Sequence, residues 1–394
     1  HIYSLQAALA SGGPNLQCIF AHLFDWQVLF QLDSHRPSKK LPRGGTPEIT
    51  RYLVGDVAKQ GVSMSDAVEL VEVWRGDLLE SIHTGHAVIC DEAGEIVQAW
   101  GDPSKVIYPR SSSKMIQALP LVESGAAAAY GLSQSQLALS CASHQGAAIH
   151  TNPVGAWLND LGLADDDFRC GPQEPRDPAD RDALIRKGQA PCRIHNNCSG
   201  KHAGFLTLSK HLNGGPEYVD IDHPVQAACK AAFEETTQET SPMFGIDGCS
   251  APNHASTLHG LGRAMAFFAT AQDRSDTRSK AAASLVQAMV TYPELVAGET
   301  RACTDLMRAM NGKVAIKTGA EGVFIAILPE QKLGIALKVS DGATRASECV
   351  MAALLVKCSV LDAAHPAAKA RMTPPVTNFA GLVTGHIRPN ATLM

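Results

Sequence analysis

The chain has 394 residues, of which 45% are hydrophobic and 19% charged, and its formal net charge at pH 7 is −5. This apolar content supplies a large buried core and excludes a disordered or collagen-like chain. The mildly acidic balance lacks the basic surface that binds phosphate backbones, so we expect no nucleic-acid partner.

The composition also bears on membranes and on the cell compartment. No segment approaches the roughly 18 uninterrupted apolar residues that cross a bilayer, and the opening residues lack the successive regions of a secretory signal. Eleven cysteines are spread along a chain too long to need disulfide cross-links, which is typical of free thiols in a reducing compartment. We therefore expect a cytoplasmic protein without a membrane partner.

The first part of the chain differs in composition from the rest. Residues 34–47 are rich in proline, glycine and basic side chains, as in a solvated linker. This composition predicts that residues 1–63 are an N-terminal extension and linker. Residues 64–394 then form the folded domain.

Predicted strands lie at both ends of that domain. A hairpin is expected at 86–100, with its turn at 91–95, and three strand-like runs follow at 313–319, 322–329 and 333–339. Helical patterns occupy most of the sequence between them and recur once at the end: 111–129, 133–139, 180–187, 201–212, 224–236, 257–272, 278–292, 300–310 and 345–357. This order predicts an α+β fold, in which an antiparallel sheet built from N- and C-terminal strands carries an inserted helical block.

Two details of these helices carry separate expectations. Pro120 lies inside the helix expected at 111–129 and should kink or shift it. Asp222 stands before the helix at 224–236 as its expected N-cap.

The first chemical motif is Ser111 with Lys114. At the start of a helix these residues lie one turn apart on one face, so the amine can reach the hydroxyl and act as its base when neutral. Burial or a neighbouring cation must lower the lysine pKa for that role. Taken alone, S-x-x-K also arises by chance, as a capping serine and a surface lysine.

Two further motifs fit the first one. Lys317, Thr318 and Gly319 lie on a late strand, and Ser143 lies in a polar loop after the helix at 133–139. The loop alone is equally typical of an ordinary helix end. The joint order of hairpin, S-x-x-K, serine loop and K-T-G is typical of serine β-lactamases and penicillin-binding proteins.

A separate polar cluster contains Cys198, Lys201 and His202, with Asp247 and Cys249 further along the chain. Two cysteines are too few for a closed structural zinc site, so a metal here needs additional ligands among these side chains or from solvent. Most other cysteines are expected to be small buried hydrophobic residues.

Five longer runs carry a family resemblance: 108–121 (YPRSSSKMIQALPL), 140–146 (SCASHQG), 195–206 (HNNCSGKHAGFL), 245–255 (GIDGCSAPNHA) and 317–324 (KTGAEGVF). In unbroken order over about residues 82–386, they resemble the rhizobial-type, or class 3, L-asparaginases. The resemblance implies a fold similar to serine β-lactamases, a homodimer, and hydrolysis of L-asparagine to L-aspartate and ammonia.

The resemblance also implies roles for individual residues. Ser111 is the expected nucleophile with Lys114 as its partner, and Ser143 with Lys317 forms a second pair. Cys198, Lys201 and Cys249 are the expected ligands of a zinc ion. Arg110, His202 and Asp247 are the expected substrate-contacting groups, and the charges of Arg110 and Asp247 complement the α-carboxylate and α-ammonium of an amino acid.

Three alternatives stay open at this level. A serine-dependent glutaminase acts on a substrate longer by one methylene, which pockets discriminate only modestly. A penicillin-binding or β-lactamase-type acyl enzyme is disfavoured because no clear S-x-N motif is found. In a non-catalytic zinc-binding scaffold, Ser111 and Lys114 are structural.

Overall fold

The structure is a computed structural model, and it describes residues 67–394. The extension predicted at residues 1–63 lies outside the described residues. The domain boundary that we expect at residue 64 therefore stays a prediction.

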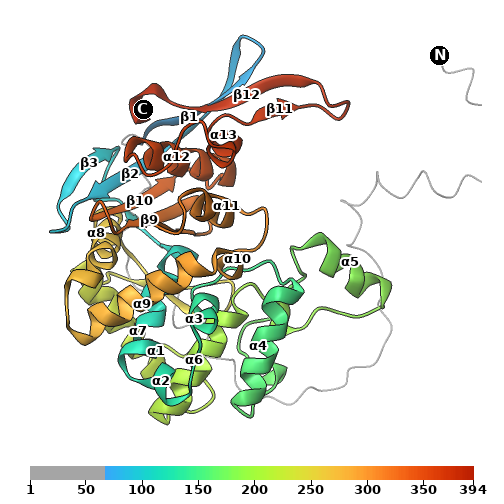
Figure 1. The fold of residues 1–394 in the computed structure, drawn as a ribbon, viewed down its shortest axis with the longest axis vertical. Coiled ribbons are helices and arrows are strands. Elements are labelled where there is room, and N and C mark those ends of the chain that lie inside the picture. Colours follow the sequence, from blue (N-terminus) through green and yellow to red (C-terminus); the bar gives the residue numbers. More distant parts are fainter. Residues whose placement is uncertain (1–66) are drawn as a thin grey trace, which may run out of the picture. The chain divides into compact units, whose positions relative to one another are not determined.

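The described part of the chain is built on one eight-stranded sheet, in which β11-β12-β1-β2-β10-β9-β8 are neighbours in that order and β3 pairs with β2. All these pairs are antiparallel. The strands are β1 (Val68–Arg75), β2 (Leu78–Cys90), β3 (Ile96–Trp100), β8 (Ala315–Thr318), β9 (Val323–Leu328), β10 (Leu333–Val339), β11 (Pro375–Thr377) and β12 (Val383–Pro389). Strands from both ends of the domain thus form a single sheet, as predicted (Figure 1).

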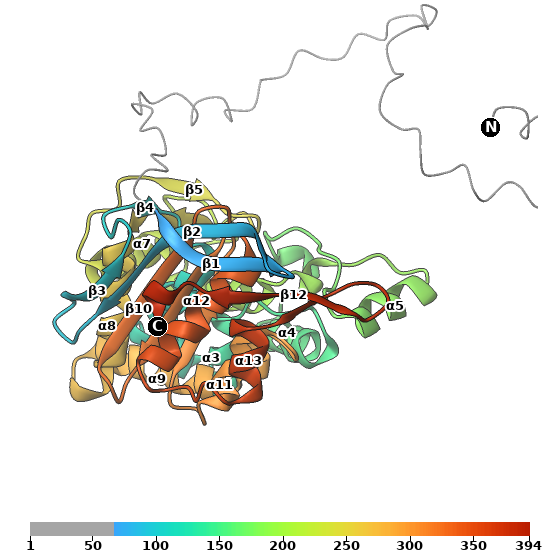
Figure 2. The ribbon, with the colours of Figure 1, turned by 90° about the horizontal axis from the view of Figure 1, so that it is seen from above.

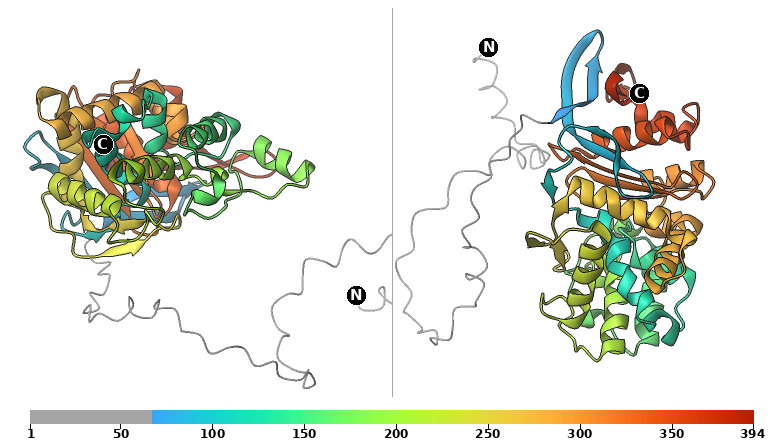
Figure 3. Two further views of the ribbon diagram at one scale, coloured as in Figure 1. Left: turned by 90° about the horizontal axis from the view of Figure 1, so that it is seen from below. Right: turned by 90° about the vertical axis from the view of Figure 1, so that its left-hand side faces the viewer.

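Helices cover both faces of this sheet. Helix α12 packs on β9 and β10 from one side, and α8 packs on β2 and β10 from the other, beside the helical block (Figures 1 and 3). The helices are α1 (Lys114–Glu123), α2 (Ala126–Ala129), α3 (Gln134–Ser140), α4 (Ala148–Asp160), α5 (Pro178–Arg186), α6 (Ser199–Leu212), α7 (Pro224–Thr237), α8 (Leu258–Ala269), α9 (Thr277–Thr291), α10 (Pro293–Val296), α11 (Ala302–Ala309), α12 (Thr344–Lys357) and α13 (Pro366–Met372). The predicted α+β arrangement is confirmed.

Two short strand pairs lie outside the main sheet. Strand β4 (Val106–Ile107) pairs with β7 (Ser256–Thr257), and β5 (Phe244–Ile246) pairs with β6 (Pro252–His254). Seen from above, β4 and β5 lie at the edge of the domain beside β2 and α7 (Figure 2). These pairs hold segments 106–110 and 244–257 near each other, which matters for the site described below.

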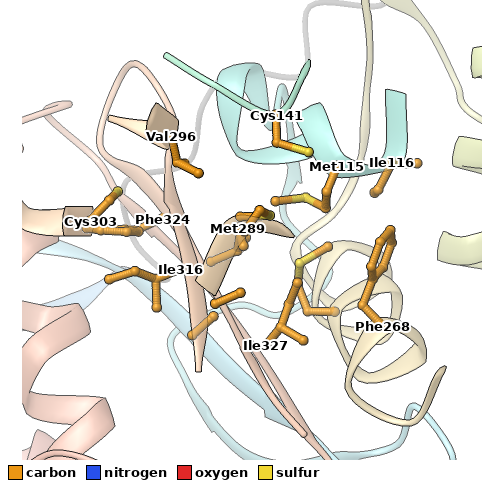
Figure 4. Packing of buried hydrophobic residues seen from close by; sticks show 14 of the residues in the cluster. Met115, Ile116, Cys141, Phe268, Met289, Val296, Cys303, Ile316, Phe324 and Ile327 are labelled. Atoms are coloured by element: carbon orange, nitrogen blue, oxygen red, sulfur yellow. The ribbon is translucent and has the colours of Figure 1, made fainter. Parts of the chain in front are cut away.

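The hydrophobic core lies between the sheet and the helical block. Every residue of β9 is buried, because helices cover this strand on both faces, which explains its continuous apolar run. Figure 4 shows Ile316 and Ile327 from the sheet facing Met115 and Met289 from the helices.

One glycine shows how closely helix and sheet approach. A Cβ atom added to Gly334 in β10 would lie 2.2 Å from the backbone nitrogen of Ala266 in α8. Real atoms do not approach so closely, so a glycine is required where α8 crosses β10.

Several local expectations are corrected. The single helix predicted at 111–129 is a 3₁₀ turn, then α1, then α2, and the break falls at Gly125, whose φ is 85°. Pro120 is tolerated inside α1. His223, and not Asp222, caps α7, because its side chain accepts a hydrogen bond from the backbone of Val225.

No helix among residues 67–394 is long and apolar enough to cross a membrane.

Candidate active site

The turn that carries Ser111 is a 3₁₀ segment, Arg110–Ser113, directly before α1. Ser112 donates a 2.7 Å hydrogen bond to the carbonyl of Pro109, and Ser113 donates a 3.0 Å bond to that of Arg110. The hydroxyl of Ser111 has no hydrogen-bond partner within residues 67–394. Of the three serines in this turn, Ser111 is therefore the one left available for chemistry.

The backbone before Ser111 is unusual. Arg110 has a φ of 54°, in the left-handed region that most side chains avoid. Its amide donates a 3.3 Å hydrogen bond to Oδ1 of Asn253, which holds the turn against the β6 strand. Residues with a strained backbone persist only where the surrounding structure holds them in place, and they are concentrated at functional sites.

Lys114 extends from α1 into the interior and is only 1% exposed. Its Nζ donates to the carbonyl of Ala142 and, at 3.1 Å, to the Sγ of Cys198. We expected this amine to reach the Ser111 hydroxyl. In the structure it instead bridges the serine loop and the first cysteine, which are the polar partners available at that depth.

The second predicted pair is hydrogen-bonded. Lys317 Nζ lies 2.9 Å from the Ser143 hydroxyl and 2.7 Å from the carbonyl oxygen of Thr318. Lys317 is fully buried, and burial lowers its pKa to about 7, with a further decrease from the nearby charge of Lys114. At neutral pH this amine is therefore close to half neutral, as a general base requires.

The K-T-G strand lies directly against the Ser111 turn. A Cβ atom on Gly319 would be 2.6 Å from the carbonyl oxygen of Pro109 and 3.3 Å from the amide nitrogen of Ser112. Only a glycine permits this approach, which brings β8 and the S-x-x-K turn together. The four predicted catalytic residues thus converge on one region of the domain.

The predicted metal ligands also lie together. Lys201 Nζ donates to Cys249 Sγ at 3.1 Å, and the Cys198 and Cys249 side chains interact. All three are nearly fully buried. A hydrogen bond from Cys198 lowers the pKa of Cys249 well below its usual value, so Cys249 is the thiolate and Cys198 keeps its proton.

The charge on Cys249 determines the state of Lys201. Burial alone lowers a lysine pKa, but the Cys249 thiolate outweighs that effect and raises the pKa of Lys201. His202 follows in the same helix. Burial lowers its pKa, a hydrogen bond with Cys249 opposes that effect, and its Nδ1 pairs with the Tyr218 hydroxyl at 2.8 Å.

Arg110 and Asp247 bind each other. The Nε and Nη2 atoms of Arg110 lie 3.1 and 2.8 Å from Oδ1 of Asp247. A cavity of about 300 Å³ opens beside this pair, lined among others by Tyr108, Arg110 and Glu321, and Ser111 is not among its lining residues. Arg110 therefore belongs to the catalytic turn and also lines this cavity.

Two asparagines support the site without having been singled out in the sequence. Asn253 holds the Arg110 turn, as described above, and Asn197 Oδ1 lies 2.8 Å from Cys198 Sγ. Asn197 stands directly before Cys198, and Asn253 follows Cys249 in the same motif run. No spacing rule distinguishes such supporting asparagines from those in an ordinary loop.

A sequence model of the L-asparaginase II family matches residues 71–389. The chain belongs to the L-asparaginase II family, and it is thus an amidohydrolase of the asparaginase type. No curated protein sequence matches it.

Solved structures give partial likenesses. A crystal structure of Mglu matches with a TM-score of 0.40 and 14% identity over 70% of this chain and 67% of that chain. Mglu in its glutamate form has the same TM-score and 12% identity, over 70% and 61%. A β-lactamase from Mycobacterium bovis matches with a TM-score of 0.37 and 15% identity, over 67% and 89%.

Proposed function

We propose that this protein hydrolyses L-asparagine to L-aspartate and ammonia through an acyl-enzyme on Ser111. The observation that carries the proposal is the buried Ser143–Lys317 pair beside the Ser111 turn, in a member of the L-asparaginase II family. A lysine with a pKa of about 7 serves as a base at neutral pH, whereas an exposed lysine does not.

The reaction takes place in two halves. The Ser111 oxygen attacks the side-chain amide carbon, its proton passes to the lysine–serine machinery, and the C–N bond breaks as that proton is returned to the departing ammonia. Water then attacks the Ser111 ester in the same way, giving aspartate and free serine. Each proton transfer by a positioned group contributes about 10²- to 10⁴-fold in rate.

The two lysines take different parts in this scheme. Lys317 is the amine that burial leaves ready to accept a proton, and the Ser143 hydroxyl relays it. Lys114 is proposed as the partner of Ser111 during the reaction, although its two hydrogen bonds in the structure go to the Ala142 carbonyl and to Cys198.

We propose zinc as the cofactor, held by Cys198, Lys201 and Cys249. Two sulfurs and one amine gather in the buried interior, a donor set that suits zinc better than magnesium or calcium. No group of three or more His, Cys, Asp or Glu side chains in residues 67–394 is placed to hold a metal, so the lysine is needed as third ligand. When bound, zinc supplies Lewis acidity near the substrate.

Substrate contacts are proposed for Arg110, His202 and Asp247. The Asp247 carboxylate, held by Arg110, suits the α-ammonium group of the substrate. His202 is fully buried and interacts with Cys249, so its proposed part in substrate binding is at that cluster. The expected homodimer and cytoplasmic location stay predictions.

The test is ammonia release by the purified protein. Asparagine, glutamine and the β-lactam nitrocefin are offered separately to the wild type and to Ser111→Ala. We expect hydrolysis of asparagine above the other two, and none by the variant. Preferred turnover of glutamine or nitrocefin, or full activity of the variant, would refute the proposal.

A further inference from the structure

The residue directly after Ser143 is a histidine that the proposed mechanism does not use. The side chain of His144 is fully buried, with an exposed fraction of 0%. A ring buried to this depth needs hydrogen-bond partners for its nitrogens, because water cannot supply them. Both nitrogens of His144 have such a partner, one in its own loop and one at the start of α6.

These two hydrogen bonds fix the nitrogen that carries the proton. The backbone amide of Gly146 donates to Nδ1 of His144 at 3.1 Å, and an amide N–H can only donate, so Nδ1 carries no proton. Burial lowers the pKa of His144 well below its usual value, and the ring is neutral at pH 7. The single ring proton is therefore on Nε2, which donates to the hydroxyl of Ser199 at 2.9 Å.

A second histidine holds the plane of this ring. His150 of α4 stacks on His144, with ring centroids 4.9 Å apart and ring planes inclined by 9°. The Nε2 atom of His150 in turn donates to the carbonyl of Glu294 at 2.9 Å. The His144 imidazole is thus fixed both in its plane and at its two nitrogens.

The backbone that leads to Ser143 is held by other groups. Lys114 donates to the carbonyl of Ala142 and to Cys198 Sγ. The amide of Ser143 itself donates to the carbonyl of Val296 at 2.8 Å. These bonds fix the loop on the side that precedes the serine.

On the side that follows Ser143, the connection is made by His144. Its backbone amide donates to the carbonyl of Asn197 at 3.1 Å, and its ring donates to Ser199, the first residue of α6. Ser199 is also fully buried, so this contact is shielded from water. One backbone bond and one side-chain bond therefore join the serine loop to the start of α6.

The position of this loop matters because Ser143 must stay close to Lys317. Residues 141–147 lie between α3 and α4 outside any helix or strand, so side-chain contacts have to set their position. The Ser143 hydroxyl lies 2.9 Å from Lys317 Nζ. Proton transfer requires heavy atoms about 2.6–3.2 Å apart, and a displacement of about 1 Å can cost about 100-fold in rate.

We propose that His144 is a positioning residue of the hydrolysis, whose Nε2–H bond to Ser199 fixes the loop that presents the Ser143 hydroxyl to Lys317. This inference rests on the proposed function. It adds a residue that acts through Ser143 without contacting the substrate.

Two amide substitutions separate the roles of the two ring nitrogens. Glutamine places its amide nitrogen near the position of Nε2, so His144→Gln keeps a donor for Ser199. Asparagine places its amide group near the position of Nδ1, so His144→Asn keeps a partner for Gly146 and loses the bond to Ser199. Ser199→Ala removes the acceptor instead. His365→Asn is the matched control, because Nδ1 of His365 also accepts a backbone amide, that of Ala367 at 3.1 Å, at the start of α13.

For asparagine we expect His144→Asn and Ser199→Ala each to lower kcat by about 10- to 100-fold, with KM changed by less than about threefold. The double variant should be no slower than His144→Asn, because both substitutions remove the same bond. His144→Gln should keep kcat within about fivefold of the wild type, and His365→Asn should match it. Each kcat is referred to the folded fraction, which thermal melts measure.

A spectrum of the wild type tests the arrangement without any activity assay. Long-range ¹⁵N–¹H correlations of histidine rings report which nitrogen is protonated, and the His144 signals are those missing from His144→Gln or His144→Asn. We expect a neutral ring at pH 7 with its proton on Nε2. A proton on Nδ1, or a doubly protonated ring, would overturn the inference even if a variant does not fold.

The kinetic outcomes separate the inference from the proposed function. Additive losses in the double variant, a normal kcat in His144→Asn, or a His144→Gln variant as slow as His144→Asn would overturn the inference and leave the proposed function intact. A change confined to KM would also overturn it, because it would indicate a substrate contact. A wild-type protein that releases no ammonia from asparagine would overturn the proposed function, and with it the catalytic part of this inference.

Discussion

Two buried lysines in this domain respond to burial in opposite ways. Lys317 faces the hydroxyl of Ser143 and the charges of Lys114 and Arg301, and its pKa falls to about 7. Lys201 is buried just as deeply but faces the Cys249 thiolate, and its pKa rises. The partner, and not the depth, decides whether a buried lysine is a base or a paired cation.

This contrast assigns different tasks to the two regions. The Ser143–Lys317 region is suited to move protons at neutral pH. The Cys198–Lys201–Cys249 region has a thiolate and an amine that are already paired, so a metal has to displace the lysine proton before it binds. Lys114 contacts both regions, because it donates to Ala142 beside Ser143 and to Cys198.

The largest effect should follow from Ser111→Ala. If the serine–lysine region does the chemistry, the rate of ammonia release should fall by about 10³-fold or more, since the nucleophile is lost. Ser112→Ala is the matched control, because that hydroxyl only bonds the Pro109 carbonyl and its loss should cost about 1 kcal/mol of stability. Similar activity in the two variants would refute the role of Ser111.

Lys317→Met should lower kcat by about 10²- to 10⁴-fold by removing the base. The variant should nevertheless melt at or above the wild-type temperature near pH 7. The pKa of Lys317 is lowered on folding, so the wild type loses stability as the pH falls from the ordinary lysine value to about 7, and this loss is complete below pH 7.

Activity assays and thermal melts of Lys317→Met, with Lys313→Met as control, test this pair of effects. Lys313 is exposed and paired with Glu330.

Lys114→Met should also lower the rate more than Cys249→Ala does. A greater loss of rate in Cys249→Ala would show that the metal region, and not the serine–lysine region, is the catalytic centre.

The pH profile sharpens the comparison. Lys317 must be neutral to act as a base, so kcat/KM should fall about tenfold per pH unit below pH 7 and level off above it. The charges that face Lys317 come from Lys114, Arg301, Cys303 and Cys198. Arg301→Gln removes one cation, which should raise the pKa of Lys317, so the acidic limb of the pH profile should move to higher pH. A profile flat from pH 5 to 8 would contradict the assignment.

The smallest effect is expected from removal of the metal. Elemental analysis should find zinc in the purified protein, and a strong chelator should remove it more readily than from a four-cysteine site. We expect KM for asparagine to rise with a smaller fall in kcat, because the serine chemistry needs no Lewis acid. Metal-free protein, or an unchanged KM with lost kcat, would oppose this expectation.

Sequence patterns predicted most of the fold, and the failures have identifiable causes. Helices with clear caps, such as α3 behind the Ser133 capping box, were found with correct type and nearly correct ends. Strand β1 was missed because its exposed and buried residues alternate irregularly, and β12 because Gly385 and Ile387 are its only buried residues. Helix α4 was missed because Pro153 lies inside it.

At the site, motif spacing located the residues but not their contacts. The proximity of β8 to the Ser111 turn depends on Gly319, which a K-T-G motif includes. The bond between Lys114 and Cys198 joins segments 84 residues apart, and no local pattern reports such a bond.

The topology of the sheet has a consequence for how the chain is made. Strand β2 pairs with β10, where Cys90 opposes Gly334, and β1 pairs with β12, where Val71 opposes Pro389. During synthesis the first partner is 334 − 90 = 244 residues away, which at about 5–20 residues per second means a wait of roughly 12–49 s. During that time the N-terminal hairpin is outside the ribosome, and the backbone groups that later pair with β10 and β12 have no partner strand. Such unpaired edges are prone to aggregate, so chaperone supply during translation should govern the yield of this protein more than the stability of the finished fold does.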